Sequence, residues 1–304
     1  MIVVMEINRD ICQNKSLNFI YCNHPLYKNK VDFGYEEEFE ISKKLGNNCA
    51  LFSFEDMADG KLKLSGDEIK GQAIYRGWMM KPKMYRTFYE ALSQKGIELI
   101  NTPEEYEKYH LLPNWYDEFQ KLTAKSVWTE DLSDESLKEI LQNFSEDVIV
   151  KDYVKSRKHE WDEACFIPDV KDVNKALEVI KTFIKRQDEY LVGGIVLREF
   201  LELKTIGHHE KSNMPISEEY RIFILNNIPI VMDSYWHHAE SNLSSEEKEW
   251  ISDISKQLKS KFVTIDLARK TDGKLVIMEL GDGQVSGLQD IPEDIFYNAF
   301  ENYK

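Results

Sequence analysis

Short apolar segments of strand length recur along the chain, and what separates them changes beyond residue 120. Up to residue 101 they alternate with stretches whose apolar positions recur every three or four residues, the spacing of one face of a helix. Farther along, several are joined in pairs by very short polar segments, as in antiparallel hairpins. The pattern predicts an α/β region with a mostly parallel sheet, followed by an antiparallel α+β region.

The α/β region is expected to have the order β-α-β-β-α-β. Its strands are expected at residues 18–23, 49–54, 72–78 and 96–101. A helix over residues 35–45 is expected to end at Gly46, and Thr102–Glu105 forms a capping box that begins a further helix. Residues 107–135, rich in aromatic and polar side chains, are expected to connect the lobes.

The later region contains two predicted hairpins, over residues 220–236 and 262–283. Their turns are predicted at Asn226-Asn227 and at Asp272-Gly273, dipeptides that favour positive backbone φ angles. Further strands are expected at residues 148–155 and 190–203, and a helix capped by Ser244–Glu247. We therefore predict an N-terminal α/β lobe over residues 1–120. The rest, residues 121–304, is predicted to form two α+β lobes with bounds near 121–200 and 201–304.

Composition restricts the class of partner. Asp and Glu number 54 against 39 Lys and Arg, so the formal net charge is -15. A field of that sign repels phosphate backbones and anionic headgroups, so neither duplex nucleic acid nor a membrane is expected as a partner. The four cysteines show no paired spacing and are expected to be reduced thiols. With no signal-peptide pattern and no apolar run near the roughly 18 residues that span a bilayer, we expect a soluble cytoplasmic protein.

Two carboxylates lie in otherwise apolar strands of the last predicted hairpin. Asp266 is in FVTIDLA and Glu279 is in KLVIMEL. Such side chains on paired strands can share a divalent cation through oxygen ligands. The alternative is that Asp266 caps a bulge and Glu279 lies on a solvated face. The segment Gly281–Gln284 would allow a phosphate to approach the backbone closely.

Basic residues also interrupt apolar strands. Lys151 lies in VIVKDYV, where a cation usually serves an anion, unless its long stem reaches solvent from an edge strand. The turn after it, residues 155–159, carries Lys158 among other basic residues and can lie over phosphates or form an ordinary surface cluster. Arg198 and Arg221 lie within two further strands, and the guanidinium group suits bidentate contact with phosphate or carboxylate. Pairing with Glu202 or Glu219 is the alternative.

Arg76 lies at the end of a predicted strand of the α/β region, where open α/β sheets place their ligands. Two roles are open for it. It can bind the carboxylate of an acceptor substrate, or it can stack on Trp78 or Trp115.

The order and spacing of these segments resemble the ATP-grasp superfamily. The strand of Lys151, the REFLEL strand, the EYRIFI hairpin, the TIDLA strand and MELGDGQVSGL occur in the same succession. Within the superfamily the chain is similar to the clade named for two arginines and a lysine, in a family once classed as a domain of unknown function. YRGWMM at 75–80 and HLLPNWYDEF at 110–119 also resemble that family. The resemblance covers about residues 70–290.

The resemblance implies ATP and Mg²⁺ as cofactors, and an ATP-grasp fold in which the two α+β lobes clasp the nucleotide. It assigns Lys151 to the α- and β-phosphates, with Lys125 as an earlier lysine at the lobe entry. Glu199 would contact the adenine amino group. The remaining nucleotide contacts are the backbone of Phe200 and Leu201 at the adenine edge and Glu202 at the ribose hydroxyls.

The resemblance also assigns Arg198 and Arg221 to the γ-phosphate or an acyl phosphate, and Asp266 and Glu279 to magnesium. In the family's second metal motif an Asn follows the Glu by two positions. Gly281 stands there in this chain, so Asp282 is expected to substitute. The loop after Lys151 also lacks the glycine-rich sequence that is common elsewhere in the superfamily.

The function that the resemblance implies is an ATP-dependent carboxylate–amine ligase that works through an acyl phosphate and releases ADP and phosphate. A small molecule, an amino acid or a peptide would supply the carboxylate and the amine. The chain has no GxSxG or Cys/His signature, consistent with chemistry that needs no protein nucleophile. A small-molecule phosphotransferase and a non-catalytic ATP-binding module are the alternatives.

Overall fold

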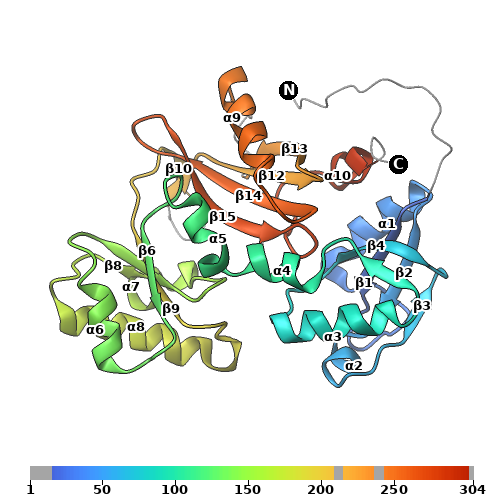
Figure 1. The fold of residues 1–304 in the computed structure, drawn as a ribbon, viewed down its shortest axis with the longest axis horizontal. Helices are drawn as coiled ribbons and strands as arrows, with labels where there is room; N and C mark the ends of the chain where they lie inside the picture. Colours follow the sequence, from blue (N-terminus) through green and yellow to red (C-terminus); the bar gives the residue numbers. More distant parts are fainter. Residues whose placement is uncertain (1–15, 209–214, 236–242, 301–304) are drawn as a thin grey trace. The chain divides into compact units, whose positions relative to one another are not determined.

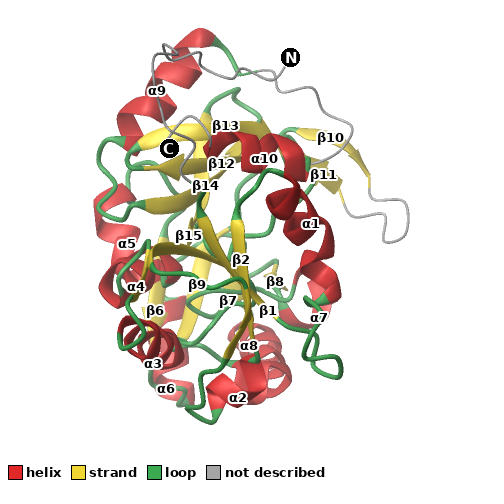
Figure 2. Cartoon of the chain, turned by 90° about the vertical axis from the view of Figure 1, so that its right-hand side faces the viewer, coloured by secondary structure: helices red, strands yellow, loops and turns green. Residues whose placement is uncertain are grey.

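The computed structural model describes residues 16–208, 215–235 and 243–300. They form two compact units that are each discontinuous in sequence. The first unit contains the described residues up to Tyr109, then Glu218–Leu267, then the chain from Gly281 onward. The second unit contains His110–Ser217 and Ala268–Leu280. The elements of each unit can be followed in Figures 1 and 2.

The first unit contains a five-stranded sheet of order β3-β2-β1-β4-β5. Its strands are β1 (Asn18–Cys22), β2 (Asn48–Phe52), β3 (Leu64–Gly66), β4 (Gly71–Arg76) and β5 (Ile97–Leu99). β1 pairs in parallel with β2 and β4, and β4 pairs in parallel with β5, while β3 is antiparallel to β2. The predicted mostly parallel sheet is confirmed.

The helices of this region follow from their end signals. They are η1 (Phe33–Tyr35), α1 (Glu36–Lys44), α2 (Phe54–Ala58), α3 (Pro82–Ser93) and α4 (Pro103–His110). Gly46 follows α1 with a φ of 77°, as predicted for a helix stop. At α4 the capping box forms, since Glu105 N–H donates to Thr102 Oγ1 and Thr102 N–H donates to Glu105 Oε2.

The second unit contains an antiparallel sheet of order β6-β9-β7-β8. Its strands are β6 (Ser126–Thr129), β7 (Val148–Lys151), β8 (Phe166–Ile167) and β9 (Ile195–Glu199). Its helices are α5 (Leu112–Phe119), α6 (Asp134–Leu141), η2 (Lys158–Glu160), α7 (Trp161–Ala164), α8 (Val173–Gln187) and η3 (Asp188–Tyr190). α6 and α8 lie together over one face of the sheet, and a shared apolar core joins them to it (Figure 1). A separate ribbon pairs β10 (Thr205–His208) with β11 (Pro215–Ser217).

A further sheet has the order β13-β12-β14-β15. Its strands are β12 (Glu219–Leu225), β13 (Ile228–Ser234), β14 (Phe262–Arg269) and β15 (Leu275–Asp282), and the helices α9 (Ser245–Ser255) and α10 (Glu293–Ala299) accompany them in sequence. Asn226 and Asn227 join β12 to β13 with φ angles of 48° and 65°, which confirms the predicted turn. The capping box at Ser244 and Glu247 also forms, and it begins α9.

One apolar core of the first unit joins segments far apart in sequence. Phe19 and Tyr21 of β1 pack in the same cluster as Phe223, Phe262 and Phe296. In Figure 2 α10 lies beside α1, which agrees with their contacts. The described residues of this unit therefore fold around β1 and β12 together.

Several expected elements differ in extent. Residues 107–135 are not a plain connector, since they contain α5 and β6. Leu112, Trp115 and Phe119 of α5 are buried at helical spacing with polar residues between them, as in an amphipathic helix. α2 and β3 are also additional. The strand expected over 148–155 ends at Lys151, because the Asp152 carboxylate accepts the next backbone N–H groups in a turn.

The helices and the cysteines can be compared with two expectations from the sequence, namely that no segment spans a membrane and that the cysteines are reduced thiols. None of the described helices is both long enough and apolar enough to cross a membrane. The cysteines at 22, 49 and 165 are buried and unpaired, while Cys12 lies outside the described residues.

Candidate functional site

A lysine and an arginine lie buried on two neighbouring strands of the second unit. Lys151 ends β7 and is 6% exposed, and Arg198 lies in β9 and is 3% exposed. Arg198 is opposite Ile149 in the register of these strands. Alternate residues of a strand share a face, so Lys151 projects from the same face as Ile149 and Arg198. The two cations therefore share one side of the sheet.

The Lys151 ammonium lies near one carboxylate but does not form a close hydrogen bond with it. Its Nζ lies 3.7 Å from Oε1 of Glu279, which is an ion pair but longer than a hydrogen bond. Burial lowers the pKa of Lys151, and the Glu279 carboxylate offsets this in part while Arg198 adds to it. Lys151 is thus a desolvated cation whose charge an anion would stabilise.

The Arg198 guanidinium forms hydrogen bonds through one nitrogen but has a second, buried donor without a partner among the described residues. Its Nη2 donates to Thr123 Oγ1 at 2.8 Å and to the Ile277 carbonyl at 3.1 Å. Its Nε is buried and has no hydrogen-bond partner among the described residues. Burial lowers the pKa of the Arg198 guanidinium to about 10, and Glu279 counteracts this. A buried unpaired donor on a cation is costly, so the position is suited to an anionic acceptor.

Sequence reasoning missed two residues of this cluster. Thr123 accepts from Arg198 and donates to the Ile277 carbonyl at 2.7 Å, so it orients the guanidinium. His110 is buried, burial lowers its pKa to about 4, and Glu279 and Lys151 both act on it electrostatically. His110 is therefore neutral near pH 7. Neither residue type carries a pattern in sequence that would have singled it out.

The other expected phosphate ligands are exposed. Lys125 donates to the Asn143 carbonyl and lies 5.1 Å above the Phe144 ring. Lys158 is exposed on η2. Its neighbour Arg157 is held in the second unit, because it donates to both oxygens of Glu160. The basic turn is thus partly engaged by ion pairs, and the phosphate roles of Lys125 and Lys158 stay predictions.

The expected adenine and ribose ligands follow β9 directly. Glu199, Phe200 and Glu202 are exposed, and Leu201 is half-buried. The Phe200 ring lies 5.0 Å from that of Phe166, centroid to centroid, so an aromatic surface adjoins the end of β9. The backbone of Phe200 donates to the Asp147 carbonyl. These nucleotide roles also stay predictions.

In the first unit, Arg221 and Asp266 are paired with each other. Nε and Nη2 of Arg221 donate to the two oxygens of Asp266 at 2.8 and 2.6 Å. Nη1 donates to the Gly287 carbonyl at 2.6 Å, and the guanidinium lies 4.9 Å from the centre of the Tyr235 ring. The ion pair thus connects Arg221, which is expected to contact the transferred phosphoryl group, with Asp266, which is expected to bind magnesium.

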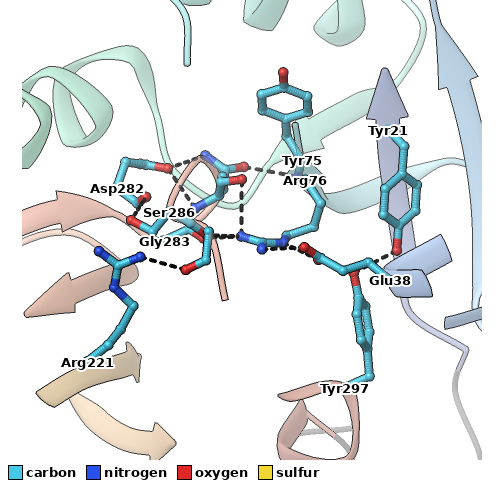
Figure 3. A network of polar contacts seen from close by, with 11 residues as sticks. Tyr21, Glu38, Tyr75, Arg76, Arg221, Asp282, Gly283, Ser286 and Tyr297 are labelled. Atoms are coloured by element: carbon cyan, nitrogen blue, oxygen red, sulfur yellow. Dashed lines mark hydrogen bonds and ion pairs between the residues drawn. The ribbon is translucent and has the colours of Figure 1, made fainter. Parts of the chain in front are cut away.

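Arg76 lies in the interior of the first unit with no exposed surface (Figure 3). Its Nε and Nη2 donate to the two oxygens of Glu38 at 2.8 and 2.9 Å. The aromatic ring under its guanidinium is Phe296, 4.9 Å away. We assign Arg76 a structural role on this geometry, because its donors are already engaged by groups of the protein.

Asp282 is 1% exposed at the end of β15. It accepts from Asn101 Nδ2 at 2.5 Å and from the backbone N–H and side-chain amide of Gln284. Burial raises its pKa to about 6, against the effect of these hydrogen bonds. Its oxygens are thus engaged inside the first unit, and its proposed substitution for the missing Asn stays a prediction.

The residues of the second unit fit the phosphates of ATP, one of the two implied cofactors. An anionic acceptor would stabilise both the Nε of Arg198, which has no partner among the described residues, and the desolvated ammonium of Lys151. For Mg²⁺, Glu279 offers an oxygen on a side chain that is 44% exposed, the donor type that this hard cation prefers. Asp266 retains lone pairs beyond those used by Arg221. The part of the chain described here holds no cluster of three metal-binding side chains.

Comparison with known proteins agrees with this fold. A family model matches residues 141–299, just over half of the chain. The model describes an ATP-grasp domain, family 3 of the clade named for two arginines and a lysine. No curated protein matches in sequence.

Three solved structures illustrate the similarity in fold. The RimK domain protein ATP-grasp from Sphaerobacter thermophilus is 9% identical with a TM-score of 0.60, covering 93% of this chain and 99% of its own. The ATP-grasp ligase PsnB, complexed with a minimal precursor, Mg and ADP, is 10% identical with a TM-score of 0.57, covering 94% and 97%. D-alanyl-alanine synthetase A from Vibrio cholerae is 11% identical with a TM-score of 0.56, covering 96% and 99%.

At such low identities these structures establish the fold and nothing finer. The family match rests on the sequence itself and includes Lys151, Arg198, Arg221, Asp266 and Glu279. The chain has the ATP-grasp fold and belongs to family 3 of the ATP-grasp clade named for two arginines and a lysine.

Proposed function

We propose that this protein is an ATP-dependent carboxylate–amine ligase that activates the carboxylate of a small molecule, an amino acid or a peptide as an acyl phosphate. The observation that carries the proposal is the buried Arg198 guanidinium, whose Nε has no partner among the described residues. Together with Lys151 it places two buried positive charges on one side of the β6-β9-β7-β8 sheet. Such a site suits the phosphates of ATP and the charge that develops on a transferring phosphoryl group.

In the proposed reaction a carboxylate oxygen of the substrate attacks the γ-phosphorus of ATP. The bond from the γ-phosphorus to the bridging oxygen breaks, and ADP leaves with both electrons. The amine then attacks the acyl carbon, phosphate leaves, and the nitrogen loses a proton to solvent. Bound Mg²⁺ would neutralise charge on the phosphates, with Glu279 and Asp266 as its proposed ligands.

The residues of the chain have separate parts in this scheme. Lys151 holds the α- and β-phosphates, and Arg198 stabilises the transferring phosphoryl group, oriented by Thr123. We assign Arg221 to the same phosphoryl group on the resemblance. Because His110 is neutral, it adds no positive charge beside Lys151. The unpaired, buried cysteines of the described chain support our further proposal of a cytoplasmic location.

An isotope experiment tests the reaction class. The protein is incubated with Mg-ATP, a panel of amines and amino acid or peptide acceptors labelled with ¹⁸O in the carboxylate. Transfer of label into released phosphate supports the ligase. ADP formation with the phosphoryl group kept on the product indicates a phosphotransferase, and ATP binding without turnover indicates a binding module. Either of these outcomes contradicts the ligase proposal.

Calorimetric titration of ATP, with and without magnesium, tests the residues. Lys151→Ala is expected to weaken ATP binding about 10- to 100-fold, because it removes a charged donor. Glu279→Ala is expected to abolish the magnesium dependence. The matched control is Lys175→Ala, a lysine of the second unit in an exposed ion pair with Glu178. Unchanged ATP affinity in folded Lys151→Ala would exclude the proposed phosphate contact.

A further inference from the structure

The Arg76 guanidinium binds three carbonyl groups of one loop in the first unit. Its Nη1 donates to the carbonyls of Gly283 at 2.7 Å, Ser286 at 2.8 Å and, more weakly, Gln284 at 3.3 Å. These residues follow β15 directly. Figure 3 shows the loop folded around the end of the arginine side chain. A single buried cation thus sets the direction of three backbone carbonyls of one loop.

β4, the strand that carries Arg76, forms a second hydrogen bond to the same loop. The backbone N–H of Tyr75 donates to Gln284 Oε1 at 3.2 Å. The Gln284 amide in turn donates to Tyr85 and to Asp282. β4 therefore contacts this loop through both a main-chain and a side-chain group.

Glu38 fixes Arg76 from the other side. Besides the two bonds from Arg76, the Glu38 carboxylate accepts from the Tyr297 hydroxyl at 2.8 Å, and that hydroxyl bonds to Tyr21 at 2.8 Å (Figure 3). Burial alone would lower the pKa of Arg76, but the charge and hydrogen bonds of Glu38 raise it above its usual value. Arg76 is a permanent cation with a fixed orientation.

The loop held by Arg76 ends at a contact with Arg221. The carbonyl of Gly287, the residue after Ser286, accepts from Nη1 of Arg221 at 2.6 Å. The other side of the Arg221 guanidinium is paired with Asp266. A shift of the loop would therefore remove one of the acceptors that orient Arg221.

We propose that Arg76, together with Glu38, is a positioning residue for the reaction. It holds loop 283–287 so that the Gly287 carbonyl orients the Arg221 guanidinium toward the transferring phosphoryl group. The role in the reaction rests on the proposed function, whereas the hold on the loop does not. In this role Arg76 does not bind the substrate directly, and it acts on Arg221 through the backbone of the loop.

Arg76→Lys tests the proposal, because lysine keeps the charge but loses the planar fork that reaches several acceptors. Its matched control is Arg86→Lys, which alters an exposed ion pair with Glu104 in the same unit. Tyr297→Phe is a milder variant that removes one hydrogen bond to Glu38. If Arg76→Lys does not fold, Tyr297→Phe is tested by the same measurements, with smaller effects expected.

The first measurement is amide hydrogen exchange of loop 283–287 in the full chain. In Arg76→Lys the Val285 and Ser286 amides, which donate to the Asp282 carbonyl, are expected to exchange about 10- to 100-fold faster. Arg86→Lys should leave them unchanged. Unaltered exchange in a folded Arg76→Lys protein would overturn the hold on the loop.

The second measurement is kinetic. Arg76→Lys is expected to lower kcat about 100-fold, the scale of a small misplacement of a catalytic group, with the Kd for ATP unchanged. The double variant with Arg221→Lys should be no slower than Arg221→Lys alone, because both act through the same guanidinium. Multiplying effects in the double variant would overturn the positioning role.

The two proposals fail in different ways. If the wild-type chain shows no turnover with any acceptor, the proposed function and the kinetic part of this inference are both contradicted. The exchange measurement still decides whether Arg76 holds the loop. If turnover is present and the double variant is multiplicative, only the positioning role is contradicted.

Discussion

Asp282 is almost completely buried and accepts three hydrogen bonds. Burial raises the pKa of its carboxyl group, and the hydrogen bonds lower it. Burial prevails and raises its pKa from 3.8 to about 6. The unfolded chain then releases this proton at lower pH than the folded chain. Stability from this group is fully present below about pH 4 and is lost as the pH rises to about 6.

We therefore expect the free energy of unfolding to include a term from Asp282 that falls between about pH 4 and pH 6 and is constant above. Two pKa units correspond to roughly 3 kcal/mol at most. Urea denaturation across this range, compared with Asp282→Asn, measures the term. The difference between the two proteins should change with pH in this window. An identical pH dependence in both would show that Asp282 titrates alike in the folded and unfolded chains.

The buried cations show what sequence can and cannot establish at this scale. A basic residue within an apolar strand predicts an anion contact, and Lys151, Arg198 and Arg76 are all buried. Which anion each one meets depends on segments distant in sequence. Arg76 meets Glu38, Lys151 lies near Glu279, and Arg198 retains an unpartnered Nε. Local pattern placed Lys151 and Arg198 within apolar strands, whereas the burial and the partner of each cation depended on tertiary structure.

At the scale of elements, the turn between β12 and β13 allows a sharp comparison of two adjacent asparagines. Both have positive φ, a conformation that glycine adopts without strain. They differ in their contacts outside the turn. Asn226 donates its backbone N–H to the Lys261 carbonyl, a bond that glycine would keep, whereas the side-chain amide of Asn227 donates to the carbonyls of Ser255 and Leu258 at 2.8 and 2.6 Å. It thereby connects the turn to the end of α9.

We expect Asn226→Gly to change the free energy of unfolding by no more than about 0.5 kcal/mol. Asn227→Gly should cost about 1–3 kcal/mol, because two carbonyls lose their donor. Denaturant unfolding of the two variants measures the difference, and each serves as the control for the other. Equal effects would mean that the turn conformation, and not the bond to α9, determines the role of these residues.

Elements with strong local signals were predictable, and those without them were not. The turn at Asn226-Asn227 and both capping boxes form because their hydrogen bonds are local in sequence. The short strand β3 lacks such a signal, since it forms by pairing with the edge of β2. The extent of β9 depends on tertiary packing as well. A side chain at Gly194 would collide with the carbonyl of Thr129, so the approach of this strand to β6 required glycine.

At the scale of the molecule, the predicted division into a lobe over residues 1–120 and a region over residues 121–304 stays a prediction. The first compact unit of the structure joins residues from both ends of the chain. Its aromatic core contains Phe19 of β1 together with Phe223 of β12, and the Phe296 ring contacts Phe223, Phe262 and Phe300. Periodicity in the sequence predicts local elements, but it does not predict which distant segments pack in the same core.

This shared core predicts that β1 and β12 unfold together. In native-state hydrogen exchange with increasing urea, the most protected amides of the two strands should converge on one opening free energy. Phe296→Leu is expected to lower that value by roughly 1–2 kcal/mol in both strands alike. Phe183→Leu, in the separate core of the second unit, is the matched control and should leave β1 and β12 unaffected. If β1 opened at lower urea than β12, or responded less to Phe296→Leu, residues 1–120 would behave as a separate lobe, and the contacts of Arg76 with loop 283–287 would join two independently folding parts.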